Sequence, residues 1–343
     1  MGDTSQNNED KDYFELGISE LDSGNFKKAI QAFKKAIKIN PDDQRVYNNL
    51  GIAYELSHDL EKARSAYEKA IEINPQNSSI LNNLAGLALL EGKPQNAAFL
   101  FDSAISADPM YIEPYMNVAR MFIEMREFLS AEPYVLKVLE IEPENAEAHN
   151  LMGVITSITE RSEEAVTHFQ SSIKSDANQA SVFSNLGTAL RNIGDRKRAI
   201  IAFEKSNELN PNSLSILNNL GVLYRETSSI DTAKLFFERA IKYYPDYPFP
   251  YLNMAELYLA VEDYDKALEN LKKYSSIVPL DMDTLFKTCG IARMANKLSD
   301  VTEEMHIFVE ESEPDDPRSK TIKEWLKSIR KKKSGMSKKT NKK

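Results

Sequence analysis

Apolar, small and proline residues recur along the chain with a period of 34 residues. Seven prolines mark this period from Pro41 to Pro279, and every interval between them is 34 residues except one of 68, whose midpoint is Ala177. When each proline is set as position 32 of a unit, position 20 is alanine in all eight units and position 8 is always glycine or alanine. A fixed period of this length is typical of proteins built from stacked structural repeats.

Within each unit the apolar positions predict two α-helices. In the second unit, Tyr47, Leu50 and Tyr54 follow the spacing of one helical face, and Ala63 and Tyr67 follow the spacing of another. The small residues at positions 8 and 20 allow the two helices to approach closely, and the proline at position 32 ends the second helix because it cannot continue it. The eight helix-turn-helix units expected in this all-α chain span residues 10–43, 44–77, 78–111, 112–145, 146–179, 180–213, 214–247 and 248–281.

This pattern resembles the tetratricopeptide repeat (TPR) family. The family pattern has Trp or Tyr, Leu-Gly and Tyr in the first helix, then Ala, Phe or Tyr, and Ala in the second helix, and a final Pro. The second unit contains it as Tyr47, Leu50, Gly51, Tyr54, Ala63, Tyr67, Ala70 and Pro75. The resemblance covers residues 10–281. It implies an alpha-alpha superhelix, a TPR solenoid, whose concave groove binds extended peptides or helices of partner proteins.

The segments outside the eight repeats have weaker patterns. Residues 282–313 keep the repeat spacing roughly and predict a degenerate ninth pair of helices. Residues 314–330 predict an amphipathic helix, with Trp325 on its apolar side, that would cap the stacking face of the last repeat. Residues 1–9 and residues 331–343 are mostly polar or charged and are expected to be disordered.

The fifth unit departs from the repeat pattern near its end. Ser172 stands at position 27, where several units have alanine, and Ala177 replaces the proline. We therefore expect a soft joint in the array at this unit.

A column of asparagines is expected on the side of the first helices that faces away from the second helices. At about 100° per residue, positions 2, 5, 6, 9, 12 and 13 lie on that side, which lines the concave groove in the TPR family. Because an asparagine amide has both donors and an acceptor, such a column can bind a peptide main chain whatever side chains it carries. The alternative is that these asparagines are merely solvated. The six members of the column are Asn49, Asn83, Asn117, Asn185, Asn219 and Asn253.

Aliphatic and arginine side chains on the same side are further binding candidates. The aliphatic side chains would give the groove an apolar surface, or else they are partly buried between adjacent repeats. The arginines would bind a carboxylate or an acidic partner segment, or else they are solvated and paired with acids of the chain itself. The aliphatic candidates are Leu89, Met116 and Ile123, and the arginines are Arg120, Arg191 and Arg225.

The charge of the chain is unevenly distributed. The 343 residues have a net charge of −9, but residues 318–343 contain 12 Lys and Arg against one acid, Glu324, so the rest of the chain carries −20. An acidic body repels nucleic acid and anionic membranes at long range. Only the basic tail could attract a nucleic acid or an anionic surface.

Composition also excludes several classes of protein. The single cysteine, Cys289, excludes a disulfide framework and a cysteine-based metal site. No apolar run approaches the roughly 18–20 residues needed to span a bilayer, and the polar, acidic first ten residues do not resemble a secretory signal peptide. A cytoplasmic location is expected.

The sequence contains no pattern of catalytic residues. The histidines His58, His149, His168 and His306 are isolated along the chain, without the spacing of metal ligands. Neither a phosphate-binding glycine loop nor a nucleophile motif is present. His149 takes the place of an aromatic residue at position 4, which indicates a packed histidine. We therefore expect no enzymatic activity, no cofactor and no metal.

These observations favour a non-enzymatic adaptor, a protein-protein interaction scaffold that binds an extended peptide or a helix of a partner protein in its groove rather than a small-molecule substrate. One alternative is a self-assembling element that associates through its repeat faces or through its C-terminal helix. The other is an electrostatic binder that acts through the basic tail.

Overall fold

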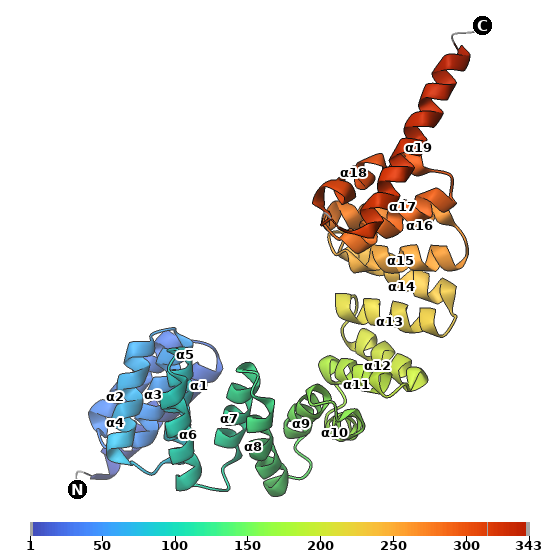
Figure 1. Ribbon diagram of the computed structural model, residues 1–343. Coiled ribbons are helices and arrows are strands. Elements are labelled where there is room, and N and C mark those ends of the chain that lie inside the picture. The colour runs from blue at the N-terminus through green and yellow to red at the C-terminus, as the bar shows by residue number, and fades with distance from the viewer. Residues whose placement is uncertain (1–2, 314, 341–343) are drawn as a thin grey trace. The chain divides into compact units, whose positions relative to one another are not determined.

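The computed structural model describes residues 3–313 and 315–340, which form nineteen α-helices, one short 3₁₀ helix and no β-strand (Figure 1). The all-α fold expected from the sequence is confirmed. The chain forms two compact units, of which unit 1 ends at Ala177 and unit 2 begins at Asn178. The division thus falls at the residue that replaces the repeat proline.

Unit 1 contains five helical hairpins, each made of a first and a second helix. The hairpins are α1 (Asp3–Asp22) with α2 (Phe26–Ile39), α3 (Gln44–Leu56) with α4 (Leu60–Ile73), α5 (Ser78–Leu90) with α6 (Pro94–Ala107), α7 (Ile112–Glu124) with α8 (Phe128–Ile141), and α9 (Ala146–Ile158) with α10 (Ser162–Ser175). Each first helix also packs against the second helix of the preceding hairpin in the unit.

Unit 2 repeats this arrangement and closes it with a terminal helix. Its hairpins are α11 (Ala180–Asn192) with α12 (Arg196–Leu209), α13 (Leu214–Glu226) with α14 (Ile230–Tyr243), and α15 (Phe249–Ala260) with α16 (Tyr264–Ile277). The ninth pair is α17 (Met282–Met294) with the 3₁₀ helix η1 (Leu298–Val301) and α18 (Thr302–Glu311), and the terminal helix is α19 (Pro317–Thr340).

The two helices of a hairpin cross where the small residues lie. A Cβ atom added to Gly51 would lie 2.5 Å from a ring carbon of Tyr67, and one added to Gly187 would lie 2.7 Å from the ring of Phe203. The alanine at position 20 of each repeat is fully buried at the same crossing, as Ala63 illustrates. The small residues that recur at positions 8 and 20 therefore mark a close contact between the two helices, and a larger side chain there would push the helices apart.

The turn between the two helices has the same backbone conformation in all nine repeats. Position 15 always has a positive φ, between 58° and 83°. Glycine adopts this conformation without steric cost, yet it occupies only three of these positions. The nine residues are Gly24, His58, Gly92, Arg126, Glu160, Gly194, Ser228, Glu262 and Asn296. Asn296 shows that the ninth pair is a repeat in its backbone although its side chains have diverged.

Two terminal segments that were expected to be disordered are helical where the structure describes them. Helix α1 begins at Asp3, within residues 1–9, and helix α19 runs to Thr340, within residues 331–343. Acidic residues are favourable near a helix N-terminus and basic residues near a C-terminus, because they oppose the helix dipole. Lysine is also a good helix former. Residues 1–2 and 341–343 of these segments, and residue 314 of the expected capping helix, lie outside the described residues.

Helix α19 covers the end of the ninth repeat. Ile322 is fully buried in the apolar cluster that α17 and α18 contribute to. The Trp325 ring stacks on Phe286 with 6.3 Å between the centroids and 14° between the planes, and the Arg293 guanidinium lies 5.0 Å from the Trp325 ring. The C-terminal helix is thus a cap that closes the apolar end of unit 2.

Candidate functional site

Each unit has a first-helix face, which we define as the side of its first helices that is turned away from their second helices. It is carried by α3, α5, α7 and α9 in unit 1 and by α11, α13, α15 and α17 in unit 2. All six asparagines at position 6 are half-buried on these faces. They are therefore neither freely exposed nor enclosed in the core.

Four of the six asparagines use their amide N–H groups within the protein. Asn83 Nδ2 donates to Asn48 Oδ1 of the preceding repeat at 2.9 Å. Asn117 and Asn253 donate in the same way, each at 2.9 Å, to the asparagine at position 5 of the repeat before, and Asn49 Nδ2 donates to the backbone oxygen of Arg45 at 2.8 Å. These amides link neighbouring repeats or hold their own helix, a role that the sequence analysis did not foresee.

The other two asparagines, Asn185 and Asn219, differ from this group. Within the described part of the chain, neither side-chain nitrogen donates a hydrogen bond to the protein. The oxygen of Asn219 accepts from Arg191 Nη1 at 3.2 Å. Helices α11 and α13 thus bring Asn185, Arg191 and Asn219 to one face with two amide donors available.

The three candidate arginines have different surroundings. Arg120 Nη2 lies 2.5 Å from a carboxylate oxygen of Glu147, and Arg225 forms an ion pair with Glu256. For these two arginines the structure shows pairing with acids of the chain. Arg191 has no Asp or Glu oxygen within 4.0 Å among the described residues, and its guanidinium bonds to an uncharged amide.

The aliphatic candidates of unit 1 are less accessible than the sequence analysis expected. Met116 is only 4% exposed and packs in the apolar cluster that includes Tyr115 and Ala119. It therefore belongs to the core rather than to a ligand surface. Leu89 and Ile123 are half-buried, which matches the alternative of partial burial between adjacent repeats.

The histidines are not all isolated in space. His149 Nδ1 on α9 lies 3.1 Å from His168 Nδ1 on α10. Their separation of 19 residues is not a known ligand spacing, so sequence reasoning missed the pair. No group of three or more His, Cys, Asp or Glu side chains within residues 3–313 and 315–340 is arranged to hold a metal ion.

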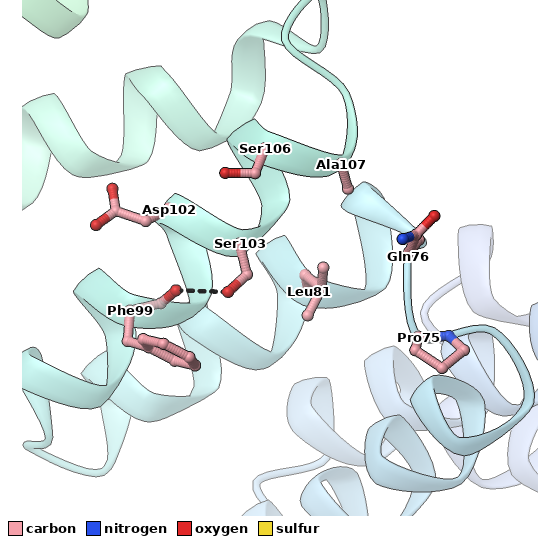
Figure 2. Close-up of a pocket in the computed structure, with 8 residues that line it drawn as sticks. All are labelled: Pro75, Gln76, Leu81, Phe99, Asp102, Ser103, Ser106 and Ala107. Atoms are coloured by element: carbon pink, nitrogen blue, oxygen red, sulfur yellow. Dashed lines mark hydrogen bonds between the residues drawn. The ribbon is translucent and has the colours of Figure 1, made fainter.

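A hollow of about 570 Å³ lies on unit 1, on the solvent side of repeat 3, which is the hairpin of α5 and α6 in residues 78–111 (Figure 2). Helix α6 supplies most of its wall, and the segment between α4 and α5 supplies the rest together with Leu81 of α5. The Ser103 hydroxyl donates to the backbone oxygen of Phe99 at 2.9 Å, so it bends toward its own helix. The lining residues are Pro75, Gln76, Leu81, Phe99, Asp102, Ser103, Ser106 and Ala107.

The fold and these faces define a tetratricopeptide repeat protein. Residues 10–221, more than half of the chain, match the model of the family described as the cilia and flagella-associated protein 70 C-terminal domain, and the chain belongs to that family. Residues 214–247 and residues 236–269 each match a model of the tetratricopeptide repeat. No curated protein matches the sequence.

Several solved structures share the fold at low sequence identity. The APC/C hetero-tetramer Cut9-Hcn1 matches with a TM-score of 0.54 and 18% identity, over 70% of this chain and 48% of that chain. A tetratricopeptide repeat protein from Parabacteroides merdae matches with a TM-score of 0.50 and 18% identity, over 68% and 93%. The type IV pilus biogenesis factor PilW matches with a TM-score of 0.51 and 17% identity, over 62% and 97%.

The solved structures share the fold alone, and the family match over residues 10–221 shows that the chain is a tetratricopeptide repeat protein. Tetratricopeptide repeat proteins are generally non-enzymatic scaffolds for protein-protein interaction, since stacked repeats present long binding surfaces. Among the described helices, none has the length and hydrophobicity needed to cross a lipid bilayer.

Proposed function

We propose that the chain is a non-enzymatic scaffold whose first-helix face in unit 2 binds an extended acidic segment of a partner protein. The observation that supports this most directly is the environment of Arg191. Its guanidinium is half-buried and hydrogen-bonds to the neutral amide of Asn219, without a carboxylate nearby among the described residues. A partly desolvated cation without a counter-ion is unfavourable, so a carboxylate from a partner improves its environment and gains a charge-assisted hydrogen bond.

The neighbours of Arg191 suit the main chain of such a segment. The amide groups of Asn185 and Asn219 have N–H donors for peptide carbonyl groups. The other side chains that α11 presents on this face include Ser181, Ser184 and Thr188, which are uncharged and small. They allow an extended chain to approach and do not repel its acidic side chains.

The test begins with peptides selected by the full chain from a random library displayed on phage. Selected peptides are expected to contain Asp or Glu, and their affinities are then measured by fluorescence polarisation. Arg191→Ala should weaken binding by tenfold or more, because a hydrogen bond to a charged group contributes about 1.5–3 kcal/mol. Asn185→Ala and Asn219→Ala should each weaken it by roughly three- to tenfold.

Arg120→Ala is the matched control, since it removes an arginine of the same charge from the first-helix face of unit 1. It should leave the affinity of the selected peptides unchanged. Equal losses in the Arg191 and Arg120 variants, or selected peptides without acidic residues, would contradict the proposal.

A further inference from the structure

The hollow of repeat 3 marks a place where other repeats carry an ion pair. Positions 26 and 29 of repeats 2, 4 and 6 are lysine and glutamate, whose side chains pair on the surface of the second helix. In repeat 3 these positions are Ser103 and Ser106, and Ala107 follows at position 30. The three pairs are Lys69–Glu72 at 2.5 Å, Lys137–Glu140 at 2.8 Å and Lys205–Glu208 at 2.8 Å.

A second substitution enlarges the same place. Repeat 4 has Tyr115 at position 4, and its hydroxyl donates to the backbone oxygen of Pro109 at 3.3 Å. Repeat 3 has Leu81 there, which has no donor to offer the corresponding oxygen of Pro75. Positions 4 and 26 are neighbours in space, since Tyr47 and Lys69, which stand at these positions in repeat 2, line one hollow of that repeat. Repeat 2 keeps both side chains, and the hollow beside its Tyr47 and Lys69 is only about 260 Å³, so the missing tyrosine and the missing lysine enlarge the hollow of repeat 3.

The walls of the hollow attract a cation. Residues 94–119 contain no Lys or Arg. The carboxylate of Asp102 on the wall is exposed and has no ion-pair partner among the described residues. Phe99 is 71% exposed on the same turn of α6, so its ring is available for a cation–π contact.

We propose that this hollow binds a lysine or arginine side chain from a segment of a partner protein, with an apolar neighbour of that residue packed on Phe99. The partner supplies from outside the cation that repeats 2, 4 and 6 supply from their own lysine. Asp102 provides the opposite charge, and the Pro75 carbonyl oxygen accepts a hydrogen bond from the bound side chain. This surface lies in unit 1 and is independent of the Arg191 site in unit 2.

The test uses a variant that restores the ordinary repeat surface. Ser103→Lys with Ser106→Glu adds one positive and one negative charge, so the net charge of the protein is unchanged. The probe is a fluorescein-labelled amphipathic helical peptide of Leu and Lys, measured by fluorescence polarisation at physiological salt against the full chain. The double variant should bind at least tenfold more weakly than the wild type, and its melting temperature should be equal or higher because the new pair is spaced i, i+3 on a helix.

Phe99→Ser should also weaken binding of this peptide at least tenfold. Ile201→Ser is the matched control, because Ile201 stands at the same repeat position on α12 and is 65% exposed; it should leave the affinity unchanged. The proposal is overturned if the wild type and the double variant bind equally, or if a peptide with Glu in place of Lys binds as well. It is also overturned if sedimentation shows a wild-type dimer that the double variant dissociates, since a second copy would then be the occupant.

Discussion

The rings of His149 and His168 share a single hydrogen bond between their Nδ1 atoms, which lie 3.1 Å apart. The Nε2 atom of His149 lies 3.0 Å from the backbone oxygen of Pro143. Because a carbonyl oxygen only accepts, Nε2 of His149 carries the hydrogen, and its Nδ1 is the acceptor in the neutral ring. His168 must then donate from Nδ1. The pair accommodates one extra proton, but a second would direct two N–H groups at each other.

This relationship predicts that stability falls in mildly acidic solution. Burial first, and then the charge of His149, lower the pKa of His168 from its ordinary 6.5; Arg161 adds to this, while Glu164 and Glu132 oppose it. The unfolded chain therefore binds a proton near pH 6.5 that the folded chain resists. The free energy of unfolding should be constant above that pH and decrease below it, by at most about 1.4 kcal/mol per pH unit for one proton.

Urea unfolding between pH 5.5 and 7.5 measures this slope. Carboxylates contribute to it as well, so the decisive quantity is the difference between the wild type and His168→Gln. The variant keeps a donor for His149 but cannot be protonated, and it should show the shallower slope. Identical slopes would mean that the His168 ring does not resist protonation in the folded chain.

A second prediction concerns two glycines that look alike in sequence. Gly51 and Gly86 both lie inside first helices, but a Cβ atom on Gly51 meets the Tyr67 ring at 2.5 Å, whereas one on Gly86 meets nothing within 4 Å. Gly51→Ala should cost about 1–3 kcal/mol, because the helices of repeat 2 must separate. Gly86→Ala should stabilise by about 0.5–1 kcal/mol, because alanine favours the helix. Thermal unfolding of the two variants checks both signs, and destabilisation by Gly86→Ala would be incompatible with the open space around it.

The asparagines give a third prediction, which separates structural amides from available ones. Asn83→Ala removes the hydrogen bond to Asn48 of the preceding repeat and should reduce the free energy of unfolding by about 1 kcal/mol. Asn185→Ala removes no hydrogen bond to the described residues and should change it by less than about 0.5 kcal/mol. Chemical denaturation measures both values. Equal losses would show that Asn185 also holds the fold.

The sequence predicts the helices well because each repeat carries the same local requirements. Alanine at position 20 and glycine or alanine at position 8 indicate that the two helices of a repeat cross closely, and this pattern is visible in each single repeat. The amide links between repeats could not be predicted in this way, since Asn83 and Asn48 are 35 residues apart and the contact depends on how adjacent hairpins stack. The helical angle per residue predicts that Asn83 and Asn219 occupy equivalent places on their own first helices, but it does not tell which amide already has a partner within the protein.

The turn and the hollow escaped prediction for other reasons. A positive φ at Arg126 is imposed by the helices on either side, although residues other than glycine rarely adopt it. The hollow of repeat 3 arises from side chains that are missing, and a serine such as Ser103 draws no attention until the lysines of other repeats are seen to fill the same place. A search of the sequence for catalytic or ligand-binding side chains finds neither the turn conformation nor the hollow, because both are seen only when the repeats are compared in three dimensions.

The last prediction concerns the C-terminal cap and which helices lose stability when its packing on the ninth repeat is weakened. Trp325 is half-buried between Phe286 and Arg293 and is the largest apolar side chain that α19 places on the ninth repeat. Trp325→Ala should reduce stability by roughly 2–4 kcal/mol, somewhat below the cost at a fully buried site. Because each repeat contacts only its neighbours, the loss should remain local. Hydrogen exchange should accelerate in α17, α18 and α19 while α1 to α10 keep their protection.

Lys327→Ala, on the exposed side of α19, is the control and should leave exchange unchanged. Faster exchange throughout unit 1 would show instead that the array unfolds as one cooperative body.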